Sequence, residues 1–283
     1  MKHSSKGVWF LLPGLCGVAV FDLIPFFDVV RRSFVRAVSG QFCGLENYRM
    51  VFANTAFRLA VHNTVRFVLV CLPLLLGVSL LLALLLNGWY TEAGKKKLCA
   101  VKALYLIPMA VPAASVVLLW KLLFDRHGFF NGLLRLCGSP AVDWMNTGAA
   151  FAVLVFSYIW KNLGYTVVLW LAGLAGVPQT VYEAAKMDGA GPVMQFFGIT
   201  LPLIRPMIFT IVVLSFLNSF RVFREAYLVA GNYPQEEMYL LQHLFNNWFM
   251  ELSVDKMAAG SVLLALVIGA AVLFLQSVWE ERA

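Results

Sequence analysis

The chain has 283 residues, of which 61% are hydrophobic and 13% are charged. Ordinary soluble domains carry about 25% charged residues, so a chain this apolar cannot hide its surface from water, and a soluble globular protein is excluded. The formal net charge of +7 could suggest a nucleic-acid partner, but the basic residues stand between apolar runs, as membrane-flanking charges do. The composition therefore indicates a membrane protein with no nucleic-acid partner.

Six apolar runs are long enough to cross the hydrocarbon core of a membrane, which takes roughly 20 helical residues. They cover residues 8–30, 63–86, 103–124, 149–172, 207–230 and 257–279. Backbone groups in lipid must be satisfied within the segment, so such runs are helices, whereas barrel strands are shorter and alternate in polarity. The sequence predicts an all-α polytopic membrane protein with about six transmembrane helices, in a single domain over residues 1–283.

A short amphiphilic insert separates the fourth and fifth runs. Thr180 and Glu183 have the spacing of a capping box, which predicts a helix beginning at Thr180, and Gly189 stands where a left-handed C-cap would fall. Pro192 suits the first position of a second helix that runs to about Ile199. The residues alone allow either a helix-turn-helix that another protein approaches closely, or an ordinary connector in which Glu183 only caps a helix.

The insert resembles the EAA loop of ABC importer permeases. The residues that carry the resemblance are Glu183, Ala184, Ala185, Asp188, Gly189, Ala190, Ile199, Leu201 and Pro202. The resemblance implies a cytoplasmic coupling loop over about residues 177–206, which docks into a groove on an ATP-hydrolysing subunit. The flanking segments 177–182 and 205–206 are similar to the carbohydrate-importing branch of the family.

Further segments resemble the maltose-type permeases, among them residues 42–48, 62–64, 105–108 and 160–161. The resemblance weakens after Phe223, where residues 229–234 replace the Gly-Gly-Pro turn of many sugar permeases. The family implies a permease subunit in a bacterial plasma membrane, importing a sugar or oligosaccharide delivered by an extracellular solute-binding protein. It further implies a second homologous permease subunit and two cytoplasmic ABC ATPase subunits as partners.

No catalytic chemistry is evident in the chain. Gly94-Lys95 is followed by Lys96, and Gly88 lies one residue too far away for a phosphate-binding loop. ATP and Mg²⁺ are therefore expected on the partner ATPase, and the chain is expected to be a transport subunit that binds no cofactor and is not an enzyme. The cysteines and histidines are scattered, so no metal site is expected.

The position of the coupling loop fixes the expected topology. If the loop is cytoplasmic, both termini and residues 88–102 are cytoplasmic too, and Lys95, Lys96 and Lys97 agree with the positive-inside tendency. The segment after the first run also carries several arginines, although this topology places it outside.

Polar groups at membrane depth usually face a bundle interior or a watery cavity. In the fourth run these are Lys161, Asn162 and Tyr165 beside Trp160, which together offer a sugar both hydrogen-bonding groups and an aromatic face. Alternatively, Lys161 holds helices together by pairing with a carboxylate such as Asp22 or Asp28.

The fifth run offers a second polar set. Asn218 and Ser219 are pathway candidates, and Arg221 and Glu225 have the spacing of an ion pair within one helix. An ion-coupled secondary carrier or channel, with Lys161 and Glu225 among its coupling groups, is the alternative function, and a purely structural membrane subunit is a third. A secondary carrier often shows an internal repeat, and none is evident in this chain.

Overall fold

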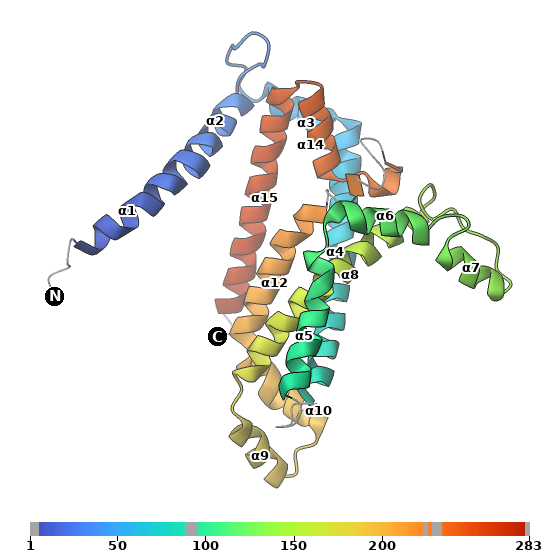
Figure 1. The fold of residues 1–283 in the computed structure, drawn as a ribbon. Coiled ribbons are helices and arrows are strands. Elements are labelled where there is room, and N and C mark those ends of the chain that lie inside the picture. Colours follow the sequence, from blue (N-terminus) through green and yellow to red (C-terminus); the bar gives the residue numbers. More distant parts are fainter. Residues whose placement is uncertain (1–5, 89–94, 223–225, 228–233, 281–283) are drawn as a thin grey trace. The chain divides into compact units, whose positions relative to one another are not determined.

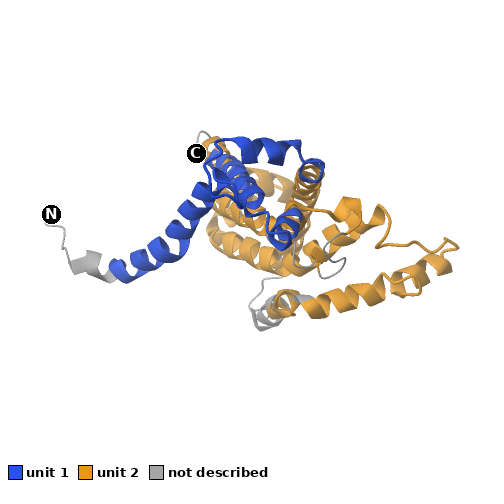
Figure 2. Cartoon of the chain, turned by 90° about the horizontal axis from the view of Figure 1, so that it is seen from above, with its two compact units in different colours: residues 1–58, 244–273 blue, residues 59–243, 274–283 orange. Residues whose placement is uncertain are grey.

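The computed structural model describes residues 6–88, 95–222, 226–227 and 234–280, and Figure 1 shows helices joined by turns and loops. The chain divides into two compact units, which Figure 2 colours separately. Unit 1 comprises residues 1–58 and 244–273, and unit 2 comprises residues 59–243 and 274–283. The predicted all-α class is confirmed.

Within the described residues, four helices are long and apolar enough to cross a membrane, and counting each of two bent helix pairs as one span raises the number of candidate spans to six. The first span, Leu11–Ser33, is formed by α1 (Lys6–Val18), η1 (Ala19–Leu23) and α2 (Ile24–Ser33). The other three lie in α4 (Thr55–Gly88), α8 (Ala149–Ala175) and α15 (Val254–Glu280). The chain is therefore a multi-pass membrane protein.

One bent pair corrects the predicted third span, and the other includes the helix of the predicted fifth span. The third is not one straight helix, because α5 (Lys95–Ala110) and α6 (Ala113–Leu123) meet at 95°. Pro112, the N-cap of α6, has no N–H to continue the helix from α5. In the fifth, α12 (Arg205–Ser219) begins at Arg205 and passes into the 3₁₀ turn η4 (Phe220–Val222). Residues 223–225 and 228–230 of that predicted span lie outside the described part of the chain.

In unit 1, a tight turn follows the first span and is held by polar contacts. Asn47 in α3 (Glu46–Ala53) is fully buried and donates to the carbonyls of Ser33 and Val35, at 3.0 and 3.1 Å. Arg36 forms an ion pair with Glu46 at 2.7 Å, which raises the pKa of the Arg36 guanidinium. The turn is thereby tied to α3 by side chains and not by apolar packing alone.

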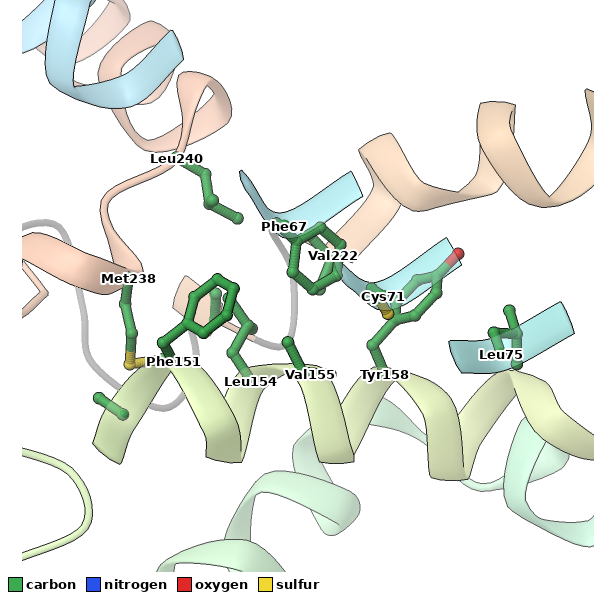
Figure 3. Close-up of a cluster of buried hydrophobic side chains, with 12 residues drawn as sticks. Phe67, Cys71, Leu75, Phe151, Leu154, Val155, Tyr158, Val222, Met238 and Leu240 are labelled. Atoms are coloured by element: carbon green, nitrogen blue, oxygen red, sulfur yellow. The ribbon is translucent and has the colours of Figure 1, made fainter. Parts of the chain in front are cut away.

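In unit 2, α8 packs along α4 through a cluster of buried apolar side chains (Figure 3). Figure 3 shows side chains of α8 pointing toward α4, and the labelled members include Phe67, Cys71 and Leu75 of α4 and Phe151, Leu154, Val155 and Tyr158 of α8. The rings of Phe67 and Tyr158 meet edge to face, with centroids 5.4 Å apart. Such dispersion and shape contacts carry helix association in lipid, where the surrounding tails are as apolar as the side chains.

A second cluster joins the other ends of α4 and α8 to α12. Trp170 of α8 donates its indole N–H to Ser79 of α4 at 2.9 Å, so a polar bond links the two helices within apolar surroundings. Gly164 of α8 lies directly against the carbonyl of Tyr105 in α5, and a Cβ at this position would clash with it. The small residue therefore permits the close approach of α5 and α8.

A group of polar side chains in unit 2, here named the α4–η5 clamp, consists of Asn63, Thr64 and His243. Asn63 donates to the carbonyls of Glu236 and Tyr239, at 2.6 and 3.1 Å. The hydroxyl of Thr64 accepts from the N–H of Leu241 at 3.1 Å. His243 accepts from the N–H of Leu240 through Nδ1 at 3.2 Å. The clamp thus ties α4 to η5 (Glu236–Met238) and to the start of α14 (Leu241–Met250).

The connection between α6 and α8 also belongs to unit 2 and contains α7 (Phe129–Leu136). Asn131 is fully buried there: it donates to the carbonyls of Asp125 and Val142 and accepts from the indole of Trp144. Asp143 receives hydrogen bonds from Asn146, which hold the pKa of the Asp143 carboxyl below its usual value. Hydrogen bonds therefore fix a connection that lacks long helices.

Candidate functional site

The insert predicted to form a coupling loop folds as two helical arms in unit 2. The first arm is α9 (Gln179–Met187). The second arm is continuous from Pro192 to Leu203 and consists of α10 (Pro192–Gln195), η3 (Phe196–Thr200) and α11 (Leu201–Leu203). We call residues 179–203 the coupling arm, and it lies at one end of unit 2, beyond α5 and α8 (Figure 1).

The start of α9 corrects one prediction. The capping box is wrong, because α9 begins at Gln179 with Pro178 as its N-cap, and no side chain caps the helix. Pro178 has no side-chain acceptor, and its fixed φ near −63° leads the chain into the helix instead. Glu183 then lies in the exposed middle of α9 and has no capping role.

The turn between the arms agrees with the sequence. Gly189 has φ +79°, and its N–H donates to the carbonyl of Lys186 at 3.1 Å. The N–H of Ala190 donates to the carbonyl of Ala185 at 2.9 Å. This pair of bonds is a Schellman motif, so the predicted left-handed C-cap is confirmed. Pro192 begins α10 as predicted, and the arm continues beyond the predicted end at Ile199.

Side-chain bonds close the two arms into a hairpin. The hydroxyls of Tyr182 and Thr200 lie 2.8 Å apart, and Gln195 donates to the carbonyl of Ala190 at 2.7 Å. No local pattern in the sequence predicts these side-chain bonds. Hydrogen bonds within the chain therefore hold the two arms together.

The closed hairpin turns apolar side chains outward. Met187 is 88% exposed, and Val193, Met194 and Phe197 are 71%, 70% and 63% exposed. The last three line a hollow of about 660 Å³ together with Gly191, Pro192 and Gly198. We call Val193, Met194 and Phe197 the docking face. Exposed apolar patches mark interaction sites, and methionine adapts its shape to a partner surface.

The predicted pathway residues of α8 do not share one face. The ring of Trp160 meets the buried Trp120 of α6, with centroids 5.1 Å apart. Asn162 is about 200° around the helix from Trp160, and its amide donates to the carbonyl of Tyr158 at 2.9 Å. Lys161 and Tyr165 are half-buried. Trp160 therefore supports packing against α6, while Lys161, Asn162 and Tyr165 are half-buried polar residues on other sides of the helix.

The predicted set in α12 is divided as well. Asn218 is half-buried, whereas Ser219 is buried and donates to the carbonyl of Phe216 at 2.6 Å. The side chain of Arg221 and the whole of Glu225 lie outside the described part of the chain. The two carboxylates considered as partners of Lys161 are in unit 1, where Asp28 pairs with Arg31 at 2.9 Å and with Arg32 at 2.5 Å.

Arg66 is a polar residue that the sequence analysis missed. It lies in α4, is exposed, and places its guanidinium Cζ 4.1 Å from the centroid of the Phe151 ring. A stacked guanidinium still presents its N–H edges to other groups. The signal available in the sequence was an arginine inside a helix that is otherwise long and apolar.

The chain is similar to known transport proteins in sequence and in fold. Residues 95–282 match the family described as binding-protein-dependent transport system inner membrane component. A crystal structure of a bacterial ABC transporter involved in import of the acidic polysaccharide alginate has the same fold, with a TM-score of 0.83. The alignment covers 97% of this chain and 94% of that one, at 22% sequence identity.

Three similar relatives come from different transport systems. The trehalose/maltose permease MalF of Thermococcus litoralis is 34% identical, over 82% of this chain and 79% of its own. The sn-glycerol-3-phosphate permease UgpA of Yersinia pestis is 32% identical, over 91% and 88%. The sulfoquinovosyl glycerol permease SmoG of Agrobacterium fabrum is 31% identical, over 80% and 74%. The chain therefore belongs to the binding-protein-dependent transport system inner membrane component family and is a permease subunit of an ABC importer.

Proposed function

We propose that this chain supplies half of a translocation path for a sugar or oligosaccharide and receives its driving force through the coupling arm. The observation that carries the proposal is the docking face, whose apolar side chains are exposed on a hairpin closed by its own hydrogen bonds. A preformed hairpin can transmit a push from a partner, because little of the movement is lost within it.

The partner that fits the docking face is an ABC ATPase subunit in the cytoplasm. ATP and Mg²⁺ belong to that ATPase, and a second homologous permease with its own ATPase completes the importer. An extracellular solute-binding protein delivers the sugar. The relatives support this assembly, because they are permeases of trehalose/maltose, sn-glycerol-3-phosphate and sulfoquinovosyl glycerol systems. They offer no support for an ion-coupled carrier.

The sugar path is proposed to run along the accessible polar side of α8. Lys161, Asn162 and Tyr165 can donate and accept hydrogen bonds there, as sugar hydroxyls require. Asn218 of α12 is a further candidate. Ser219 hydrogen-bonds to its own helix, and Trp160 packs against Trp120. Both residues therefore position the helices that line the path.

Co-purification with the ATPase tests the proposal. Phe197→Ser removes a ring that is 63% exposed on the docking face, and Phe249→Ser removes one that is 59% exposed on α14. We expect the first variant to lose the ATPase on affinity purification and the second to retain it, with equal membrane insertion of both. Retention of the ATPase by Phe197→Ser, and by a Val193, Met194 and Phe197 triple serine variant, would refute the docking assignment.

The proposed orientation places both termini and the coupling arm in the cytoplasm. Cys43, which is half-buried, and Cys137, which is exposed at the end of α7, then lie outside, and Cys99 lies inside. In intact cells, a membrane-impermeant maleimide should label single-cysteine variants that keep Cys137 or Cys43 and spare one that keeps Cys99. Permeabilised cells show whether each thiol can react at all. Labelling of Cys99 alone in intact cells would invert the orientation and remove the basis for cytoplasmic docking.

A further inference from the structure

The coupling arm passes directly into α12 through a sharp bend. The helix over Pro192–Leu203 and the helix over Arg205–Ser219 meet at 72°. Ile204, which separates them, is only 2% exposed and belongs to the buried cluster that joins α4, α8 and α12. The bend is therefore anchored in the protein interior, and the residues next to it decide whether movement of the arm reaches α12.

Arg205, the first residue of α12, contacts the end of α15. Its Nη2 donates to the main-chain carbonyl of Trp279 at 3.3 Å, and its Cζ lies 5.4 Å from the centroid of the Trp279 ring. The last carbonyls of a helix have no partner within the helix, and a cation at this end also interacts favourably with the helix dipole. Arg205 thus stabilises the end of α15 in two ways.

The indole of Trp279 is also held by a second side chain of α12. Phe209 stands one turn after Arg205, and its ring centroid is 5.6 Å from that of Trp279. Residues four apart lie on the same face of a helix, so Arg205 and Phe209 together form a seat for the indole. We call these three residues the α12–α15 latch.

A cleft separates the last turn of the coupling arm from the end of α15. It has a volume of about 440 Å³, and it is lined by Leu201 and Pro202 on one side and by Val278 and Trp279 on the other. Arg205 and Ile208 form the rest of its lining. Within the described part of the chain, this space leaves room for the arm to move toward α15 while the latch holds the first turn of α12.

We propose that the α12–α15 latch is a coupling device, in which Arg205 and Trp279 position the first turn of α12 so that movement of the arm rotates α12. Without the latch, the arm would bend at Ile204 into the cleft, and ATP hydrolysis would proceed with less transport. The inference rests on the proposed docking of an ATPase to the arm. It assigns Arg205 and Trp279 a positioning role, not a contact with sugar or ATPase.

The test measures sugar transported per ATP hydrolysed by the full importer in proteoliposomes, with maltose as the first probe and sn-glycerol 3-phosphate as the second. Arg205→Met and Trp279→Ala each remove the stacked pair. We expect each to lower this ratio about tenfold, because hydrogen bonds and cation–π contacts of a guanidinium shift an equilibrium by roughly that factor. Trp279→Phe keeps a ring in the seat and should stay close to the wild-type ratio. Phe274→Ala, which removes an exposed ring of α15, is the matched control.

The double variant Arg205→Met/Trp279→Ala decides whether the two residues act as one unit. Its ratio should fall less than the product of the two single losses, since both changes remove the same guanidinium–indole contact. Independent, multiplying losses would overturn the proposal. So would an unchanged ratio in both single variants accompanied by lower thermal stability, because that result assigns the contact to folding alone. Absence of a bound ATPase on the wild-type chain would refute the proposed function, whereas unchanged ratios with the ATPase bound and active would refute the latch alone.

Discussion

The coupling arm and the α4–η5 clamp, both in unit 2, differ in which side chains they expose and which they bury. The arm exposes apolar side chains, including Met194 at 70%, on a segment outside the long apolar helices. The clamp buries polar side chains, with Asn63 3% exposed and His243 fully buried. Exposed apolar patches mark interaction sites, whereas buried polar groups form their hydrogen bonds within the chain.

The difference separates residues that serve assembly from residues that specify the fold. Loss of an exposed apolar group on the arm removes nothing that the isolated chain needs, so stability is expected to survive while coupling is lost. Loss of a clamp residue leaves a buried carbonyl or N–H without its bond, so stability is expected to fall first. The following changes test this separation, beginning with the largest expected effect.

A change at the turn of the coupling arm should abolish transport. Gly189 has φ +79°, a conformation that costs other residues roughly 1–2 kcal/mol, and Gly189→Trp adds a bulky ring at the exposed turn that joins the arms. We expect transport assays to show no uptake and purification to show weak ATPase binding, with normal membrane insertion. Glu183→Lys, a charge reversal on the exposed side of α9, should have the same direction of effect.

Gly138→Trp is the control for backbone strain. Gly138 has φ +74° and no neighbouring atoms in the way of a side chain, and it lies after α7, away from the arm. Full uptake by Gly189→Trp and Glu183→Lys, with the ATPase bound normally, would show that the arm does not couple.

A change in the clamp should act on stability. Asn63→Leu removes the hydrogen bonds to the carbonyls of Glu236 and Tyr239, and loss of the buried bond to Tyr239 costs about 1–3 kcal/mol. The melting temperature of the purified chain should therefore fall by several degrees. Asn162→Leu is the comparison, because its amide bonds only to a carbonyl of its own helix and is half-buried. Equal melting temperatures for the two variants would contradict the structural role of the clamp.

The contrast also explains what the sequence could predict. The Schellman turn at Gly189 and the helix start at Pro192 follow from local rules, and the structure confirms both. The sequence could not show that the helix breaks at Pro112 but continues through Pro73 and Pro108. Neighbouring helices decide whether a proline is tolerated inside a helix.

Contacts between residues far apart in the sequence could not be predicted either. The two carbonyls that Asn63 holds are 173 and 176 residues along the chain, so no local pattern marks Asn63 as a clamp. The capping box failed because Pro178 took the N-cap position ahead of the predicted start. Local rules therefore predicted the hairpin of the coupling arm, whereas the clamp and the bent spans depend on tertiary packing.

The buried imidazole of the clamp predicts a pH dependence. Burial lowers the pKa of His243 from 6.5 to about 4. The unfolded chain therefore takes up a proton as the pH falls below about 6.5, while the folded chain does so only near pH 4, so stability decreases over this window by up to roughly 3 kcal/mol. His243→Asn keeps an acceptor for the N–H of Leu240 but does not titrate. The melting temperature of this variant should change less between about pH 7 and about pH 5 than that of the wild type. The same change of melting temperature with pH in both proteins would contradict the role of His243.

The smallest expected effect concerns Lys161, which belongs to neither region and lies half-buried in α8. Lys161→Met keeps the approximate length of the side chain but removes its charge and its donors. If Lys161 faces the sugar, uptake per assembled complex should fall several-fold, because a hydrogen bond to a charged group contributes about 1.5–3 kcal/mol and water can replace part of it in an accessible position. Uptake is measured at equal amounts of complex, and Lys121→Met, the same change at an exposed position of α6, serves as the control. Lower stability with unchanged uptake would place Lys161 among the residues that hold helices together, as the clamp does.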